Sequence, residues 1–246
     1  MEESVSERRC RLERWKSLAF NEREEKRRAA ALDVQVFADA RGEEMLALAS
    51  GRPSVGENSV VFMAWEKPYM VRLVALLELT HNDRVLEIGY GLGFSARAIC
   101  DRRPTAHDVL EIAPAVVERS QTTQPTNIIV DSWQHYLKST KNKYDAVFFD
   151  DFPLDDGEKK AGLHSRWIDF LMALRPALQD QARITGYLAH DDALQHLPEG
   201  YRLETLGEFQ LPEKNHHRVP PDDCLYHGPD DRCLLPLLRY HKTTTS

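Results

Sequence analysis

The chain has 246 residues, 42% of them hydrophobic, and a formal net charge of −7. A chain of this size forms one large domain, or a domain with an appendage, and this apolar content permits a real core. The acidic balance argues against a general nucleic-acid binder, because no basic excess is available to neutralise phosphates.

No apolar run approaches the ~20 residues that a membrane span needs, so no membrane partner is expected. The highly charged N-terminus lacks the apolar core of a signal peptide, which favours a cytoplasmic location. The four cysteines form no C-x-x-C pair, and His216-His217 with Cys224 and Cys233 fits no zinc spacing. No metal site is therefore expected.

Residues 1–58 are predicted to form a helical N-terminal extension. Residues 2–28 interleave Glu with Arg and Lys, a pattern that favours a solvated helix with i,i+4 ion pairs. A second helix is predicted from about Ala29 to Ala49, and Gly51-Arg-Pro53 would end it. Three roles are open for this extension: a plain surface appendage, a lid over the functional site, or an arm that forms a homodimer.

Residues 59–246 are predicted to form an α/β domain. Ser59–Trp65 is apolar and extended, and Glu66–Thr80 has apolar residues at helical spacing. Short apolar runs then alternate with helical patterns, including one at Leu163–Leu174, which is typical of βα units around a parallel sheet. The predicted parallel strands are Arg84–Ile88, His107–Glu111, Asn127–Val130, Tyr144–Asp150 and Ala182–Tyr187. Strand-like runs at Tyr201–Phe209, Cys224–His227 and Cys233–Tyr240 predict an antiparallel C-terminal edge.

A glycine-rich segment follows the first of these strands. Gly89, Gly91 and Gly93 let the backbone turn sharply and approach a ligand without a Cβ in the way, and the next helix points its N-terminal N–H groups at that ligand. A dinucleotide fingerprint, G-x-G-x-x-G, would need glycine where Phe94 stands. The pattern present, Glu87-x-Gly89-x-Gly91-x-Gly93, resembles motif I of the class I S-adenosylmethionine-dependent methyltransferases. A glycine turn in some other α/β protein is the alternative.

The resemblance implies a Rossmann-like, mostly parallel sheet that binds S-adenosyl-L-methionine and releases S-adenosyl-L-homocysteine. Glu111, at the end of the second strand, is positioned to accept hydrogen bonds from both ribose hydroxyls. Ser132 and Trp133 follow the third strand, where the adenine would meet a polar partner and an indole. Glu87 is expected to orient the glycine loop or the amino-acid end of the cofactor. Asp150, at the end of the fourth strand, completes the expected cofactor contacts.

Three further segments resemble one family in particular. They are similar to motifs of guanidinoacetate N-methyltransferase and of the related fungal arginine δ-N-methyltransferases, and the likeness runs in order over about residues 60–240. The segments are Trp65-Glu66-Lys67-Pro68-Tyr69-Met70, Phe149-Asp150-Asp151-Phe152-Pro153-Leu154, and Val219-Pro220-Pro221-Asp222-Asp223-Cys224-Leu225-Tyr226.

The resemblance implies methyl transfer to a guanidino nitrogen of a small molecule. Two carboxylates can grip a planar guanidinium through forked hydrogen bonds, and Glu66 and Asp150 match the family's pair. Asp150 is the expected proton acceptor, with Glu66 orienting the substrate. Asp151 stands at a variable position and is expected to be a surface or capping carboxylate. The expected substrate-binding residues are Trp65, Glu66, Tyr69, Phe149, Asp150, Phe152, Tyr187 and His190.

The acceptor itself is suggested by a departure from the family pattern. After the fifth strand this chain reads Thr185-Gly-Tyr-Leu-Ala-His-Asp-Asp192, where guanidinoacetate enzymes carry a Thr-Ser pair that holds a carboxylate. Asp191 and Asp192 would repel a carboxylate but suit an α-ammonium, which favours free L-arginine over guanidinoacetate. A protein arginine methyltransferase and a catalytically silent scaffold of the same fold are the alternatives.

Overall fold

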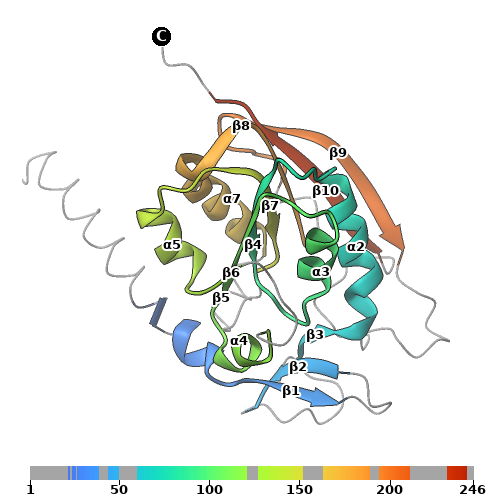
Figure 1. Cartoon of the computed structure of the whole chain (residues 1–246), viewed down its shortest axis with the longest axis vertical. Coiled ribbons are helices and arrows are strands. Elements are labelled where there is room, and N and C mark those ends of the chain that lie inside the picture. The colour runs from blue at the N-terminus through green and yellow to red at the C-terminus, as the bar shows by residue number, and fades with distance from the viewer. Residues whose placement is uncertain are drawn as a thin grey trace, which may run out of the picture.

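A seven-stranded sheet forms the centre of the computed structural model, in the order β6-β5-β4-β7-β8-β10-β9 (Figure 1). The structure describes residues 22, 24–25, 27–38, 44–49, 60–120, 127–151, 163–188, 194–210 and 232–242. The strand order reverses between β4 and β7, which neighbour each other in the middle of the sheet. A crevice at such a reversal is where α/β proteins of this kind bind ligands.

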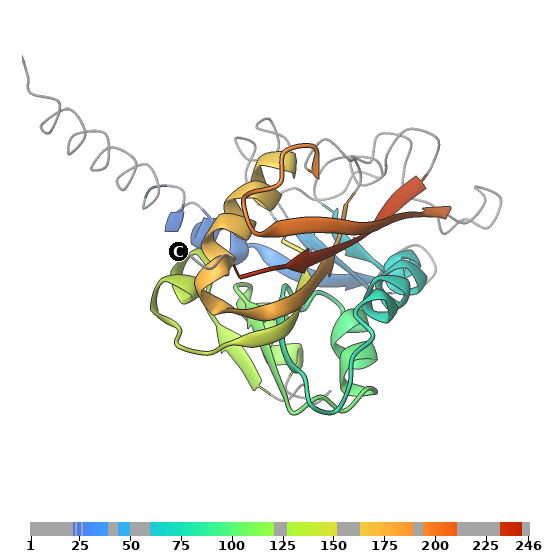
Figure 2. The ribbon, with the colours of Figure 1, turned by 90° about the horizontal axis from the view of Figure 1, so that it is seen from above.

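Five strands of this sheet are parallel and confirm the predicted βα units. They are β4 (Arg84–Ile88), β5 (Ala106–Glu111), β6 (Asn127–Val130), β7 (Tyr144–Phe149) and β8 (Leu178–Gly186). The last two strands, β9 (Tyr201–Gln210) and β10 (Arg232–Tyr240), pair antiparallel, and β10 pairs antiparallel with β8. The predicted antiparallel C-terminal edge is therefore confirmed, as Figure 2 shows from above. The predicted run at Cys224–His227 lies outside the described residues.

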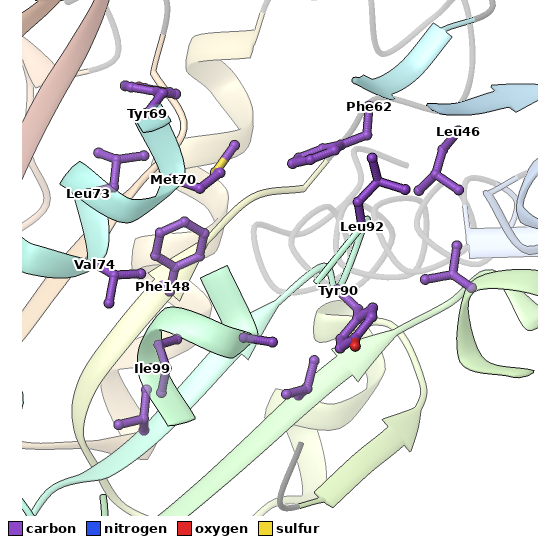
Figure 3. Close-up of a cluster of buried hydrophobic side chains, with 14 of the residues drawn as sticks. Leu46, Phe62, Tyr69, Met70, Leu73, Val74, Tyr90, Leu92, Ile99 and Phe148 are labelled. Carbon is purple, nitrogen blue, oxygen red and sulfur yellow. The ribbon is translucent and has the colours of Figure 1, made fainter. Parts of the chain in front are cut away.

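Helices cover both faces of the sheet because its central strands are apolar on both sides. One core lies between the sheet and α2 (Lys67–Leu76), α3 (Phe94–Cys100) and α4 (Pro114–Ser120). The other lies under α5 (Trp133–Ser139) and α7 (Leu163–Leu174). Two short 3₁₀ turns complete these layers, η1 (Ala64–Glu66) before α2 and η2 (Arg175–Ala177) after α7. Figure 3 shows part of the first core, where Met70, Leu73 and Val74 of α2 lie around Phe148 of β7.

The N-terminal extension departs from the prediction. Its helix, described at residues 22, 24–25 and 27–31, is followed by β1 (Val34–Ala38) and β2 (Glu44–Leu48), so the helix predicted at 29–49 is wrong. Strands β1, β2 and β3 (Val60–Met63) form a separate antiparallel sheet. The β-branched and aromatic side chains of Val34, Val36 and Phe37 favour this extended conformation. Because β2 pairs with β3, the extension shares a sheet with the first strand of the 59–246 domain.

Among the described helices, none is long and apolar enough to cross a lipid bilayer. Within the same described ranges, no group of three or more His, Cys, Asp or Glu side chains lies close enough together to hold a metal ion. Of the four residues considered for zinc, only Cys233 falls in the described part of the chain, where it is buried in β10.

Candidate functional site

The glycine loop between β4 and α3 needs glycine for two physical reasons. Gly89, Gly91 and Gly93 have φ values of +81°, +54° and +77°, which L side chains rarely adopt. A Cβ at Gly89 would also lie 2.2 Å from the backbone oxygen of Asp150. The loop therefore presses directly against the end of β7, where Asp150 begins the next segment.

Gly89→Ala is expected to lower the free energy of unfolding by about 2–4 kcal/mol, because the new Cβ meets backbone and the residue keeps a positive φ. Urea denaturation measures this. The matched control is Gly207→Ala in β9, where the nearest atom to an added Cβ is the Leu235 Cβ at 3.4 Å and the nearest backbone atom is 3.9 Å away, both ordinary contact distances. That variant is expected to stay within about 1 kcal/mol of the wild type. Equal stability of the two variants would mean that the loop accepts a side chain.

A pocket lies beside this loop at the carboxyl ends of the central parallel strands. It is the position that the strand order predicts for a ligand. The predicted site residues on its surface are Gly89, Gly91, Glu111, Ser132, Trp133 and Asp150. A further wall, called here the N-terminal wall, is made of Arg27, Val34 and Leu46 from the extension together with Phe62 of β3. Figure 3 shows Phe62 and Leu46 of that wall beside Leu92 of the glycine loop.

Glu111, the last residue of β5, links the glycine loop to the segment that follows β5. Its carboxylate accepts hydrogen bonds from the backbone N–H groups of Tyr90 (2.9 Å), Ile112 (2.7 Å) and Ala113 (2.8 Å). Burial raises the pKa of Glu111, although these N–H donors oppose the rise. The carboxylate is thus fixed at the pocket surface, where the sequence predicts a partner for hydroxyl groups.

The segment after β6 contributes the next part of the pocket. Ser132 is the N-cap of α5, and its Oγ accepts a hydrogen bond from the His135 backbone N–H at 3.2 Å. Trp133 lines the pocket, yet its ring is only 6% exposed and packs edge-on against Phe170 and Phe149. Its indole N–H donates to Asp151. Stacking of Trp133 on an adenine stays a prediction.

Glu87 lies below the loop rather than on the pocket surface. It is fully buried, accepts a hydrogen bond from Ser95 of α3, and pairs with His107 Nε2 of β5 at 2.7 Å. Burial lowers the pKa of His107, but the Cys100 and Glu87 partners outweigh it and raise the value to about 9. These contacts favour the loop-orienting role of Glu87 over direct contact with a ligand.

Asp150 and Glu66 come from different elements, and the charges of both act on the hydroxyl of Tyr69. Asp150 follows β7, where its N–H donates to the Ile88 carbonyl at 3.0 Å, and Glu66 ends η1 with 4% exposure. Burial raises the pKa of the Tyr69 hydroxyl most, and Cys233, Asp150 and Glu66 raise it further. Both carboxylates therefore lie within electrostatic reach of the same buried hydroxyl.

Asp150 holds its proton more tightly than an ordinary aspartate. Burial raises its pKa to about 7, and the charges of Asp151, Glu87 and Glu111 contribute, against the opposing Arg166. Among the described residues, none makes a hydrogen bond to its carboxylate. Such a group, poised near neutral pH at a pocket surface, suits general base chemistry.

Several predicted substrate-binding side chains lie in the core instead. Phe149 is 3% exposed and stacks on Phe170 with 3.9 Å between ring centroids, so its ring lies in the core, and its contact with a substrate stays a prediction. Successive strand residues point to opposite faces, and Phe149 points toward α7. Tyr69 is fully buried, and its hydroxyl donates to the Leu234 carbonyl at 2.5 Å, which makes it a core residue rather than an open site wall.

Of the remaining predicted substrate residues, Trp65 and Tyr187 are described by the structure and Phe152 and His190 are not. Trp65 is 4% exposed, and Tyr187 is half-buried with its ring edge-on to Tyr69 at 5.3 Å. Phe152 and His190 lie outside the described residues, as do Asp191 and Asp192. Their roles stay predictions.

Asp151 is the pocket residue whose position differs from the prediction made for it. It was expected on the surface, but its side chain is 12% exposed and accepts two hydrogen bonds from Arg27 Nη1, at 2.8 and 3.0 Å. Arg166 of α7 and the Trp133 indole also donate to it. Burial opposes ionisation, but Arg166 and Arg27 hold the pKa of Asp151 below its usual range. The sequence gives no signal for these pairings, because Arg27 is 124 residues away.

Comparison with known proteins decides the family. The family model described as guanidinoacetate N-methyltransferase matches residues 55–190, more than half of the chain. The chain belongs to the guanidinoacetate N-methyltransferase family. The match runs from before β3 to beyond β8 and includes Glu66, the glycine loop, Glu111 and Asp150, whereas Arg27 of the N-terminal wall lies outside it.

Curated relatives of this guanidinoacetate N-methyltransferase family member are fungal proteins. Protein arginine N-methyltransferase 2 of Neurospora crassa is 27% identical over 179 residues, which cover 65% of this chain and 40% of that protein. The Emericella nidulans protein of the same name is 31% identical over 104 residues, which cover 39% of this chain and 24% of that protein. The chain thus spans less than half the length of these relatives.

Solved structures share the fold at low identity. Spermidine synthase from Thermotoga maritima has a TM-score of 0.54 at 14% identity, covering 86% of this chain and 70% of that one. The N-methyltransferase NodS from Bradyrhizobium japonicum, in complex with S-adenosyl-L-homocysteine, has a TM-score of 0.50 at 14% identity, covering 73% and 89%. These likenesses establish the Rossmann-like methyltransferase fold alone.

Proposed function

We propose that this chain is an S-adenosylmethionine-dependent N-methyltransferase that acts on the guanidino group of a small molecule, with free L-arginine or an arginine-like amino acid as the preferred acceptor. The observation that carries the proposal is Asp150 on the surface of the glycine-loop pocket, with the buried Glu66 as the second carboxylate inside the family match.

The pocket residues suit S-adenosyl-L-methionine. Gly89 and Gly91 leave room for backbone contact, Glu111 offers a carboxylate for ribose hydroxyls, and Ser132 with Trp133 borders the adenine position. The anionic surroundings of Asp150 favour a cationic sulfonium. When bound, this cofactor supplies an electrophilic methyl group. The complex of NodS with S-adenosyl-L-homocysteine supports the same ligand class for this fold.

The acceptor chemistry follows from the two carboxylates. A guanidinium offers five N–H donors in a fixed plane, which two carboxylates can hold by forked hydrogen bonds. This grip aligns one nitrogen for in-line attack, and such positioning supplies several kcal/mol. Guanidinium nitrogen is a poor nucleophile, so a base must take its proton as the new C–N bond forms. Asp150, with its pKa near 7, is that base, and Glu66 orients the substrate.

L-Arginine is expected to be methylated with a kcat/KM at least about 10-fold above that of guanidinoacetate, because the acids at 191 and 192 favour an α-ammonium over a carboxylate. Mass spectrometry of reactions with a panel of guanidino compounds measures this. A clear preference for guanidinoacetate would refute the arginine assignment while leaving guanidino methylation intact.

A protein acceptor is the second candidate, and the names of the fungal relatives favour its inclusion. An arginine-containing peptide in the same panel separates the two, since a small-molecule enzyme would leave the peptide unmodified. The N-terminal wall forms part of the pocket lining, which supports a small acceptor and a lid role for the extension.

Calorimetry with S-adenosyl-L-methionine tests the scaffold alternative, because a catalytically silent scaffold need not bind the cofactor.

A further inference from the structure

The N-terminal helix meets the catalytic edge of the sheet at one buried carboxylate, Asp151. Arg27 comes from that helix and Arg166 from α7, and their exposed fractions are only 4% and 7%. Both guanidinium groups donate to Asp151, and the Trp133 indole provides a further donor. One negative charge is thus held between two positive charges in a nearly dry setting, where electrostatic interactions are strong.

Asp151 is also the chain neighbour of Asp150, the proposed proton acceptor. Arg27, Asp150 and Asp151 all line the same pocket. The charges of Asp151, Glu87 on β4, Glu111 on β5 and Arg166 on α7 act on Asp150. The charged residues that line the pocket with it are Arg27, Glu111, Asp131 and Asp151. Of these pocket residues, only Arg27 comes from outside the family match.

We propose that the Arg27–Asp151 ion pair couples docking of the N-terminal helix to the electrostatic state of Asp150, so that Arg27 and Asp151 are positioning residues for the proposed reaction. The inference rests on the proposed function in that Asp150 is taken as the proton acceptor. Neither residue needs to touch the substrate, since each acts through Asp150.

The two partners act on Asp150 with opposite signs. Asp151 is a like charge that disfavours ionisation of Asp150, and Arg27 compensates part of that charge. Removing Arg27 leaves more uncompensated negative charge, so Asp150 should hold its proton to higher pH. Removing the Asp151 charge leaves the positive charges of Arg27 and Arg166 without their carboxylate partner next to Asp150 in the chain, so Asp150 should lose its proton at lower pH. If the ion pair only held the structure together, loss of Arg27 and loss of the Asp151 charge would shift the pH at which Asp150 loses its proton in the same direction. Both substitutions would then act by breaking the same contact.

The test compares Arg27→Gln with Asp151→Asn in the full chain. The acidic limb of kcat/KM against pH reports the free enzyme's base. We expect its midpoint to rise by about one pH unit in Arg27→Gln and to fall by about one unit in Asp151→Asn. Arg27→Lys keeps the positive charge, so its midpoint should stay close to the wild-type value. The control is Arg239→Gln on β10, whose ion pair with Glu204 includes no residue of the pocket and whose loss should leave the midpoint unchanged.

Midpoints that move in the same direction in both variants, or in neither, would overturn the inference. The carboxyl stretch of Asp150, followed by infrared difference against the matching Asp150→Asn protein, gives the same midpoints without turnover. If the wild type methylates no guanidino compound, the proposed function fails, and the infrared titration still decides whether Arg27 and Asp151 move Asp150 in opposite directions. Thermal melting confirms that each variant is folded.

Discussion

Asp150→Asn is expected to reduce kcat at saturating substrate by about 1000-fold, within the range for removal of a general base. The amide keeps the shape of the carboxylate but cannot take the proton from the attacking nitrogen. The acidic limb near pH 7 in the wild-type kcat/KM profile should disappear, because the group that titrates there is gone. Mass spectrometry of the methylated product measures the rate, and near wild-type kcat would contradict the role of Asp150.

The same substitution should make the protein more stable at pH 8. The folded-state pKa of Asp150 is raised from 3.8 to about 7, so ionising it costs the folded state about 2–4 kcal/mol once the pH exceeds both values. This cost is absent below pH 4 and grows as the pH rises toward 7. Calorimetric melting at pH 8 should show a higher Tm for Asp150→Asn. Asp180→Asn, at an exposed carboxylate of β8, is the control and should change neither kcat nor the pH profile.

Glu66→Gln is expected to lower kcat/KM for the guanidino acceptor by about 100- to 1000-fold, mainly through KM. The amide removes the charge and turns an N–H donor toward a guanidinium that needs acceptors. Affinity for S-adenosyl-L-methionine should stay near the wild-type value, because Glu66 is not on the surface of the cofactor pocket. Steady-state kinetics and calorimetry measure the two quantities.

A control for Glu66→Gln is Glu78→Gln, at an exposed position beyond the end of α2. It carries the same chemical change at the other end of α2. Both kcat/KM for the acceptor and the affinity for S-adenosyl-L-methionine should stay unaltered. Loss of cofactor affinity equal to the loss of acceptor affinity in Glu66→Gln would indicate general damage to the site. An unchanged KM would mean that Glu66 does not contact the acceptor.

The central sheet could be predicted because its strands are short apolar runs bounded by turn residues, as at Arg84–Ile88 and Tyr144–Phe149. The N-terminal sheet could not, because β2 pairs with β3 across an intervening segment and local patterning in 29–49 resembles a helix. Alternation of side chains along β7 explains why Phe149 points into the core while Asp150 reaches the pocket.

The candidate site also contains residues that could be predicted from the sequence and residues that could not. The glycine loop and Glu111 follow from strand positions alone. Glu66 and Asp150 were identified through resemblance to a family, because no local pattern reveals two carboxylates 84 residues apart in the chain. Asp151 escaped both routes, since its partners are set by how the N-terminal helix and α7 pack. Long-range ion pairs of this kind leave no periodic trace in the sequence.

The buried His107–Glu87 pair beneath the loop limits the alkaline side of the working range. The folded-state pKa of His107 is raised to about 9, so its contribution to stability is complete below about pH 6.5 and is lost as the pH rises through 9. Beyond that point the buried Glu87 carboxylate would lose its positively charged partner and keep the hydrogen bond from Ser95. Asp150, the proposed base, is expected to be ionised only above about pH 7. The pH range in which Asp150 is ionised and the His107–Glu87 pair is intact is therefore about two units wide. Its lower limit is set by the pKa of Asp150 and its upper limit by the pKa of His107.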